Sequence, residues 1–309
     1  MTMQRLSSAR FHKAKAFIHT HARPLDIKLY EYHFEGGSAD AVLDALAAFQ
    51  NADGGFGHGL EPDFRLAASS PMATTVGLQY ATAVSAPSTH PLVQNAIRYL
   101  INTYETQNAY WPAAFENVND APHAFWWHVE ALTPPVEAAW PNPSAEITGY
   151  LHQHATLVPP DFLKTVTARA QQNLTSSEII SGDTPQKYNV LCWQRALPHL
   201  PEGMKTAVTA AITRTYQTYD AIQPDTFGEL SVLAFAPNPL SLLAQIMPKT
   251  VAQCLEDELN KQAEDGGWWP SWHWGQYEEV WPVAKQEWAG KITVENLQAF
   301  QAFGRIAAD

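Results

Sequence analysis

An Asp-Gly-Gly turn, found near both ends of the chain, constrains the fold more than any other stretch. The first copy follows Gln50 in QNADGGF and the second follows Gln262 in QAEDGGW. Neither glycine has a Cβ, so the backbone can reverse with positive φ and pack closely on its neighbour. One such turn is typical of a helix end, whereas two copies in the same residue order predict a repeated structural unit.

The spacing of the copies predicts the size of that unit. A weaker third copy, Gln107-Asn-Ala-Tyr-Trp, keeps the glutamine and the aromatics without the glycines, 57 residues after Gln50. From Gln50 to Gln262 is 212 residues, which is four units of 53. A unit of that length accommodates two helices and their connections, and 309 residues hold nearly six of them.

Apolar spacing predicts a helix ahead of the first turn. Ser38 is a plausible N-cap, and Leu43, Leu46, Ala47 and Gln50 fall on one helical face. Similar patterns predict helices over residues 8–20, 69–84, 93–104, 121–132, 142–155, 159–173, 186–199, 203–221, 248–263 and 292–306.

Other elements are weakly indicated. The stretch from Pro24 to Gly37 is less regular, and no run of alternating β-branched residues predicts a strand. The sequence therefore predicts an all-α fold.

Helical hairpins can stack as an open solenoid or curl until the last meets the first. An open solenoid needs polar capping repeats, but the C-terminal stretch keeps apolar positions at Leu297, Phe300 and Phe303. The pattern favours a single domain, residues 1–309, forming an α/α toroid of about six helical hairpins with inner and outer helix layers.

The two Asp-Gly-Gly segments resemble the Gln-x-x-Asp-Gly-Gly-Phe/Trp repeat of the squalene cyclases and the protein prenyltransferase β subunits. That resemblance implies an α/α toroid and, on family grounds, isoprenoid chemistry. It is strong over the two turns and weak at Gln107 to Trp111.

The catalytic motifs of those two groups are not found in this chain. No Asp-x-Asp-Asp sequence, the proton donor of the cyclases, is present. The zinc-binding Asp-x-Cys pair of the prenyltransferases is also missing, because Val190 and Leu191 precede Cys192, and Ala252 and Gln253 precede Cys254. The function must therefore be argued from this chain's own residues.

Charge and composition exclude several partners. The net charge of −12 makes nucleic acid and anionic membrane surfaces poor partners, and no Lys/Arg cluster suits a diphosphate. No apolar run reaches the ~18 residues of a membrane span, and the N-terminus is charged where a signal peptide is apolar. We expect a cytoplasmic protein with two free buried thiols, no metal and no cofactor.

The loop HGLEPDFR after the first turn is the first candidate site. It holds His58, Glu61, Asp63 and Arg65 just before a helix, whose N-terminal amides favour a carboxylate or an anionic ligand group. As a catalytic site, Asp63 or Glu61 would act as general acid or base with His58, and Arg65 would bind substrate. As a structural feature, the loop would be a solvated cap with an Arg–carboxylate bridge.

Aromatic residues near His, Glu and Tyr form two further candidate sites. In HAFWWHVE, Trp127 and Glu130 are three residues apart and would share a helical face. Substrate-binding candidates there are His123, Trp126, Trp127 and Glu130, with Glu146 and Tyr150 on the next helix, and Trp272, His273 and Trp274 in the tryptophan-rich stretch 268–281. Tryptophans can stabilise a carbocation, stack on sugars, or simply pack repeat against repeat.

These features predict a small-molecule enzyme with an aromatic-lined cavity and carboxylate acid/base chemistry on a neutral ligand, apolar or sugar-like. A terpenoid cyclase-like activity is one form of it. The alternatives are a carbohydrate-active α/α-barrel enzyme, namely a hydrolase, lyase or epimerase, and a non-catalytic scaffold that binds a ligand or partner. The oligomeric state stays open.

Overall fold

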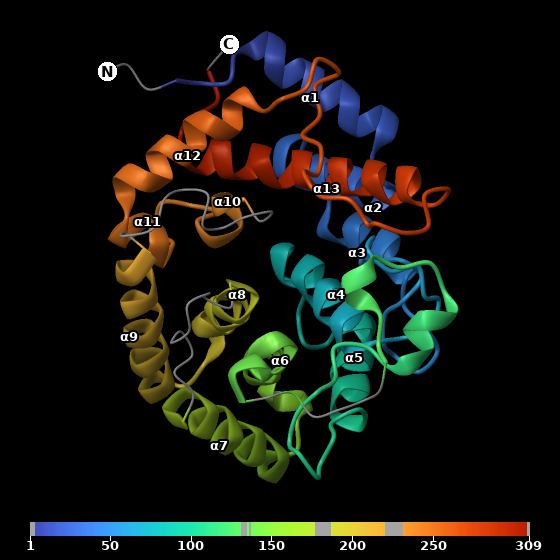
Figure 1. Cartoon of the computed structure of the whole chain (residues 1–309), viewed down its shortest axis with the longest axis vertical. Coiled ribbons are helices and arrows are strands. Elements are labelled where there is room, and N and C mark those ends of the chain that lie inside the picture. The colour runs from blue at the N-terminus through green and yellow to red at the C-terminus, as the bar shows by residue number, and fades with distance from the viewer. Residues whose placement is uncertain (1–3, 131–134, 136, 177–186, 220–230, 308–309) are drawn as a thin grey trace. The chain divides into compact units, whose positions relative to one another are not determined.

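The computed structural model describes residues 4–130, 135, 137–176, 187–219 and 231–307 (Figure 1). Within these ranges the chain forms α-helices and short 3-10 helices, and its β-type pairing is limited to isolated bridges. The all-α prediction is confirmed. No helix among the described residues is both long enough and apolar enough to cross a membrane.

The chain divides into two compact units. Unit 2 comprises Leu46–Thr215, and unit 1 combines Met1–Ala45 with Tyr216–Asp309. Unit 1 is therefore built from both ends of the chain. Two helices, α3 (Ala39–Ala47) and α9 (Glu202–Tyr219), cross the boundaries.

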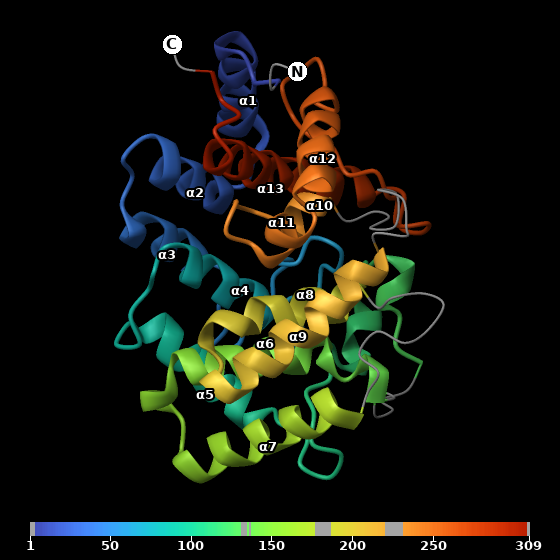
Figure 2. The same ribbon diagram turned by 90° about the vertical axis from the view of Figure 1, so that its left-hand side faces the viewer.

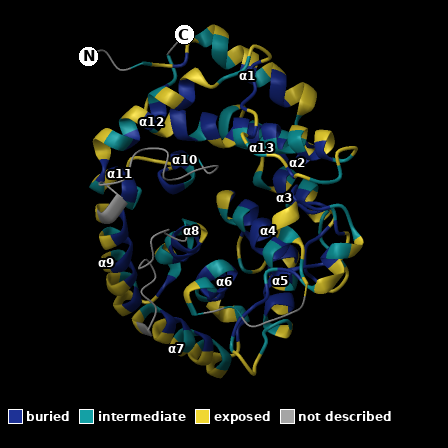
Figure 3. Cartoon of the chain, viewed as in Figure 1, coloured by how far each residue is buried: buried dark blue, intermediate teal, exposed yellow. Residues whose placement is uncertain are grey.

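Among the residues that the structure describes, unit 2 holds five α-helices besides the parts of α3 and α9 that it includes. Its further helices are α4 (Pro71–Ala83), α5 (Pro91–Asn102), α6 (Pro141–Gln153), α7 (Pro160–Ser176) and α8 (Lys187–Ala196). Helix α6 packs against both α4 and α8, and these three form what we call the α4–α6–α8 layer. Helix α7 packs on α6 from the other side, and α7 and α9 turn exposed residues away from the layer (Figures 1 and 3).

Unit 1 is organised around its longest helix. It contains α1 (Ser8–His21), α2 (Pro24–Phe34), α10 (Val232–Phe235), α11 (Leu242–Ile246), α12 (Pro248–Asn260) and α13 (Trp281–Ala302). Helix α13 packs against α1 and α2, and α12 packs against α10 and α11 (Figure 2). Leu6 pairs with Ile306, which ties the two ends of the chain together.

The first Asp-Gly-Gly turn is held by hydrogen bonds from its own side chains. Gln50 Nε2 donates to the Gly54 carbonyl at 2.9 Å and to the Leu92 carbonyl of α5 at 2.9 Å. Asp53 Oδ1 accepts from the Gly55 amide at 3.0 Å. Gly54 has φ +94°, and a Cβ on it would lie 2.4 Å from the Asn95 carbonyl oxygen, so only glycine fits.

The second turn repeats this geometry against α1. Gln262 Nε2 donates to the Gly266 carbonyl at 2.9 Å and to the Arg10 carbonyl at 3.0 Å. Gly266 has φ +97°, and a Cβ on it would lie 2.4 Å from the Lys13 carbonyl oxygen. Gly267 abuts the ring of Phe17, as Gly55 in the first turn abuts that of Tyr99.

The two turns thus contact α5 and α1 at matching positions. The contacted residues are Leu92, Asn95 and Tyr99 in α5, and Arg10, Lys13 and Phe17 in α1, and both sets are spaced at i, i+3 and i+7. In unit 2 the first turn leads into α4, and the helix that it contacts, α5, comes after α4 along the chain. The second turn leads into α13 in the same way. In unit 1 the contacted helix is the first helix of the chain, so α1 takes the place of a helix that would follow α13.

In the third copy of the repeat, the structure changes which residue aligns with Gln50 and Gln262. The amide of Trp111 donates to Ser144 Oγ at 3.1 Å, as the Trp268 amide donates to Thr293 Oγ1 at 2.9 Å. Aligned on these tryptophans, Glu105 rather than Gln107 takes the glutamine position. Glu105 accepts hydrogen bonds from the Gln107 and Asn108 amides, which lower its pKa, so the turn closes without glycines.

One helix was not predicted, and one helix prediction was wrong. Residues 24–34 form α2, with Pro24 at its first position, although the pattern there is irregular. The described part of the predicted helix 121–132 has only a 3-10 turn, Phe125–Trp127, flanked by extended residues, while residues 131 and 132 lie outside the described ranges.

Candidate functional site

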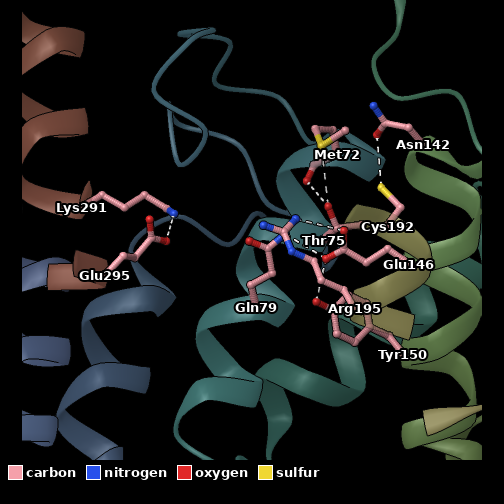
Figure 4. A network of polar contacts seen from close by, with 10 residues as sticks. All are labelled: Met72, Thr75, Gln79, Asn142, Glu146, Tyr150, Cys192, Arg195, Lys291 and Glu295. Atoms are coloured by element: carbon pink, nitrogen blue, oxygen red, sulfur yellow. Dashed lines mark hydrogen bonds and ion pairs between the residues drawn. The ribbon is translucent and has the colours of Figure 1, made fainter. Parts of the chain in front are cut away.

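Glu146 of α6 is the centre of a polar cluster in unit 2 (Figure 4). Its Oε1 accepts hydrogen bonds from Gln79 Nε2 at 2.8 Å and from Tyr150 Oη at 2.8 Å. Its Oε2 accepts from Arg195 Nη1 at 3.2 Å. Three helices, α4, α6 and α8, therefore place donors around one carboxylate.

Close packing of parallel helices brings these residues together. A Cβ on Gly149 would lie 2.6 Å from the Cα of Ala196, so α6 and α8 approach closely at that point. Glu146 comes before Gly149 on α6, and it contacts Arg195, which comes before Ala196 on α8. The contacting residues come in the same order along both helices, so α6 and α8 are parallel. Their relative register brings Arg195 into contact with Glu146.

Helix α4 joins the layer with the same direction. Gln79 contacts Glu146, and three residues later Thr82 Oγ1 donates to Gln153 Oε1 at 3.3 Å. Helix α4 begins at Pro71, with Ser70 as its N-cap. That start places Gln79 beside Glu146.

Three hydrogen-bond donors, one of them a guanidinium, surround the Glu146 carboxylate. The Glu146 side chain is 2% exposed, and burying a carboxylate is costly unless donors and a counter-charge replace its lost hydration. Burial lowers the pKa of Arg195, but Glu146, Tyr150 and Cys192 together raise it, so the pKa lies above its usual value. Burial, and then Glu146, raise the pKa of Tyr150 well above its usual value, so the phenol stays protonated.

Cys192 lies one turn before Arg195 on α8. Its Sγ is 3.6 Å from Asn142 Oδ1, and burial followed by the Glu146 charge raises the pKa of the thiol well above its usual value. Burial also raises the pKa of Cys254, in unit 1. Both thiols are buried and unpaired with each other, as the sequence predicted.

We therefore expect both cysteines to resist alkylation in the native protein. A raised pKa means less thiolate at pH 8, and the thiolate is the reactive form. Iodoacetamide labelling followed by mass spectrometry should give two rapid modifications in urea and slow modification without it. Rapid labelling of Cys192 in the folded protein would contradict its burial.

The HGLEPDFR loop pairs with the segment that contains His123. The Arg65 amide donates to the Pro122 carbonyl at 2.8 Å, and the Ala124 amide donates to the Asp63 carbonyl at 2.8 Å. Phe64 and His123 lie opposite each other in this bridge. The structure thus brings together the first two candidate sites, which are about 60 residues apart in the sequence.

Within this loop the predicted catalytic residues differ in exposure. Asp63 is 6% exposed, whereas Glu61 is half-buried and His58 is exposed. His58 has φ +55°, and its Nε2 lies 2.9 Å from Asn51 Oδ1. Arg65 folds back over Gly59, where a Cβ would lie 2.9 Å from the guanidinium carbon.

The predicted aromatic wall around His123 takes a different form. Trp127 and Glu130 share no helical face, because the backbone becomes extended after Trp127. Trp126 is 39% exposed, Trp127 packs on Phe64 with ring centroids 4.9 Å apart, and Glu130 is exposed. His123 is buried and stacks on an exposed neighbour, His128.

The tryptophan-rich stretch belongs to unit 1, and part of it is core. Trp274 is fully buried, and its ring packs on that of Trp281 with centroids 5.6 Å apart. Trp272 packs edge-on against Trp288, and His273 is exposed, with Nε2 3.3 Å from a Glu278 carboxylate oxygen. This arrangement matches the repeat-packing alternative for Trp274.

Of the predicted ligand-binding residues, the structure places Glu146 and Tyr150 together in the α4–α6–α8 layer. Sequence reasoning missed Gln79 and Arg195, which complete that cluster. Glu146 and Tyr150 are four residues apart on one helix, a local signal, but nothing local indicates a partner 49 residues further along. No group of three or more His, Cys, Asp or Glu among the described residues is placed to hold a metal ion.

Comparisons of the chain with protein-family models, curated proteins and solved structures give no match. The function therefore has to be inferred from the geometry of these residues.

Proposed function

We propose that the protein is a small-molecule enzyme whose ligand binds at the α4–α6–α8 layer and whose general base is Glu146. The observation that carries this proposal is the convergence of an amide, a phenol and a guanidinium on one buried carboxylate. Hydrogen bonds to a carboxylate weaken it as a base, so Glu146 would accept a proton once a ligand draws Arg195 away from Oε2.

The donors on Glu146 suit one class of reaction better than the two suggested by the sequence, because both carboxyl oxygens accept hydrogen bonds. Cyclisation started by protonating an isoprenoid needs a protonated acid. Glycoside hydrolysis needs two carboxyl groups ~5–10 Å apart. Helices α4, α6 and α8 contain no carboxylate other than Glu146. Proton abstraction from a ligand fits this cluster better than either.

The HGLEPDFR loop is a second candidate for catalysis. Its buried carboxylate, Asp63, is fixed through backbone pairing to the His123 segment. Acid/base chemistry by Asp63 and Glu61, with an isoprenoid or a carbohydrate as ligand, remains a proposal for this loop. The resemblance to the α/α toroids is a proposal too, supported by the repeated turns and by α1 standing in for a helix after α13.

We expect the Glu146→Gln variant to lose at least about 100-fold in turnover, because a positioned base typically contributes ~10²–10⁴-fold. Purified protein would be incubated with isoprenoid alcohols, short oligosaccharides and small carboxylic acids. Ligand binding would be followed by thermal shift, and products by mass spectrometry.

Asp63→Asn is the matched control, since it makes the same change in a second buried carboxylate. If Asp63→Asn abolishes turnover and Glu146→Gln does not, catalysis lies in the loop. Binding of a ligand without product by the wild-type protein would instead support the non-catalytic scaffold.

A further inference from the structure

The Arg195 guanidinium is only partly engaged. Among the residues that the structure describes, its single hydrogen-bond partner is Glu146, bonded through Nη1 alone at 3.2 Å. A guanidinium has five N–H donors in a planar fork, and the Arg195 side chain is 36% exposed. Donors on this fork therefore face the accessible surface beside Glu146.

We propose that Arg195 binds an anionic group of the ligand, most simply a carboxylate, at the α4–α6–α8 layer. This inference rests on the proposed function and narrows it, because the sequence predicted a neutral ligand. A carboxylate matches the fork with two parallel hydrogen bonds, which are short and charge-assisted.

The surroundings of Arg195 favour this choice. The layer's helices contain three charged residues, Glu146, Lys187 and Arg195, so the layer carries a net positive charge within a chain of net charge −12. Gln79 is half-buried beside Arg195 and gives Glu146 one amide hydrogen, which leaves its second hydrogen for the same ligand. One arginine and one amide suit a monoanionic carboxylate better than a diphosphate.

Binding would also change the state of Glu146. A ligand carboxylate that takes the Arg195 fork competes for the guanidinium with Glu146 Oε2, which has Arg195 as its hydrogen-bond donor. Oε1 would keep its bonds from Gln79 and Tyr150. Arg195 would thus bind the anion, and Oε2 of Glu146, the proposed general base, would become free to contact the same ligand.

The test measures anion binding directly. Butanoate, its neutral isostere butanamide, and inorganic phosphate would be titrated by calorimetry into the wild-type protein, Arg195→Gln and Arg195→Lys. We expect wild-type protein to bind butanoate at least tenfold more tightly than butanamide. Arg195→Gln should remove that preference, and Arg195→Lys, which keeps the charge without the fork, should retain part of it.

Two further variants keep the result interpretable. Arg98→Gln removes an exposed arginine of unit 2 and should bind butanoate as the wild type does. The double variant Glu146→Gln/Arg195→Gln removes both charges, so it leaves no unpaired ion and should also lack the preference. Circular dichroism would confirm that each variant is folded.

Equal butanoate affinity in wild type and Arg195→Gln would overturn the inference, as would equal affinity of the wild type for butanoate and butanamide. Tighter binding of phosphate than of butanoate would show that the anionic group of the ligand is a phosphate and not a carboxylate. Different experiments refute the two proposals, that Glu146 is the general base and that Arg195 binds an anion. Turnover that survives Glu146→Gln refutes the base, whereas anion binding that survives Arg195→Gln refutes only the recognition of an anion.

Discussion

A chain that lacks residues 4–21 is expected to lose the folded structure of unit 1. This truncation removes α1, whose buried side chains include Phe17, Ile18 and Ala14, and leaves the second Asp-Gly-Gly turn without its contacts. Loss of one large buried apolar side chain costs ~2–5 kcal/mol, while whole domains are stable by only ~5–15 kcal/mol. Hydrogen exchange of the α13 amides should rise to the rate of an unfolded chain.

The same helix supplied from the other end of the chain should restore the fold. In a circular permutant that starts at Gly37 and ends at Gly36, about six Gly/Ser residues would join residue 307 to residue 4. Such a linker spans roughly 13 Å, enough for ends that the Leu6–Ile306 bridge already holds together. If α1 replaces a helix after α13, the permutant should unfold within a few degrees of the natural chain. A permutant as unstable as the truncation would refute that equivalence.

Local chemistry explains what the sequence predicted well. The Gln-x-x-Asp-Gly-Gly order specifies its own turn, because Asp53 and Gln50 bond to backbone groups within four residues. Ser38 likewise caps α3, with its hydroxyl 3.1 Å from the Ala41 amide. Such features depend on neighbours in the sequence, so pattern reasoning finds them.

The errors arise where contacts between distant segments decide the conformation. Residues 122–124 are held extended by backbone bonds to Asp63 and Arg65, which override the helical appearance of HAFWWHVE. Arg195 reaches Glu146 next to the point where Gly149 allows α8 to pack closely on α6. Neither contact leaves a pattern within a window of a dozen residues.

The candidate site shows the same division. Glu146 and Tyr150 were predicted from their aromatic and acidic neighbourhood, and they meet at i, i+4 on α6. Trp274, a predicted ligand-binding residue, is completely buried, and tryptophan content alone does not distinguish a lined cavity from a packed core.

Gly266→Val should destabilise unit 1 by more than about 3 kcal/mol, through two separate costs. Valine is β-branched and strongly disfavours the φ of +97° found here. Its Cβ would also lie 2.4 Å from the carbonyl oxygen of Lys13, a backbone atom that moves only if α1 moves. Urea unfolding followed by tryptophan fluorescence would report the loss, since several tryptophans lie in unit 1.

Two other glycines, Gly304 and the equivalent of Gly266 in the first turn, Gly54, separate those two costs. Gly304 has φ +64° but open space around its missing Cβ, so Gly304→Ala should cost only about 1 kcal/mol, the backbone term alone. Gly54→Val, with φ +94° and the same 2.4 Å approach to a carbonyl oxygen, should destabilise unit 2 as Gly266→Val destabilises unit 1. Similar midpoints for Gly266→Val and Gly304→Ala would show that α1 does not pack on the second turn as α5 packs on the first.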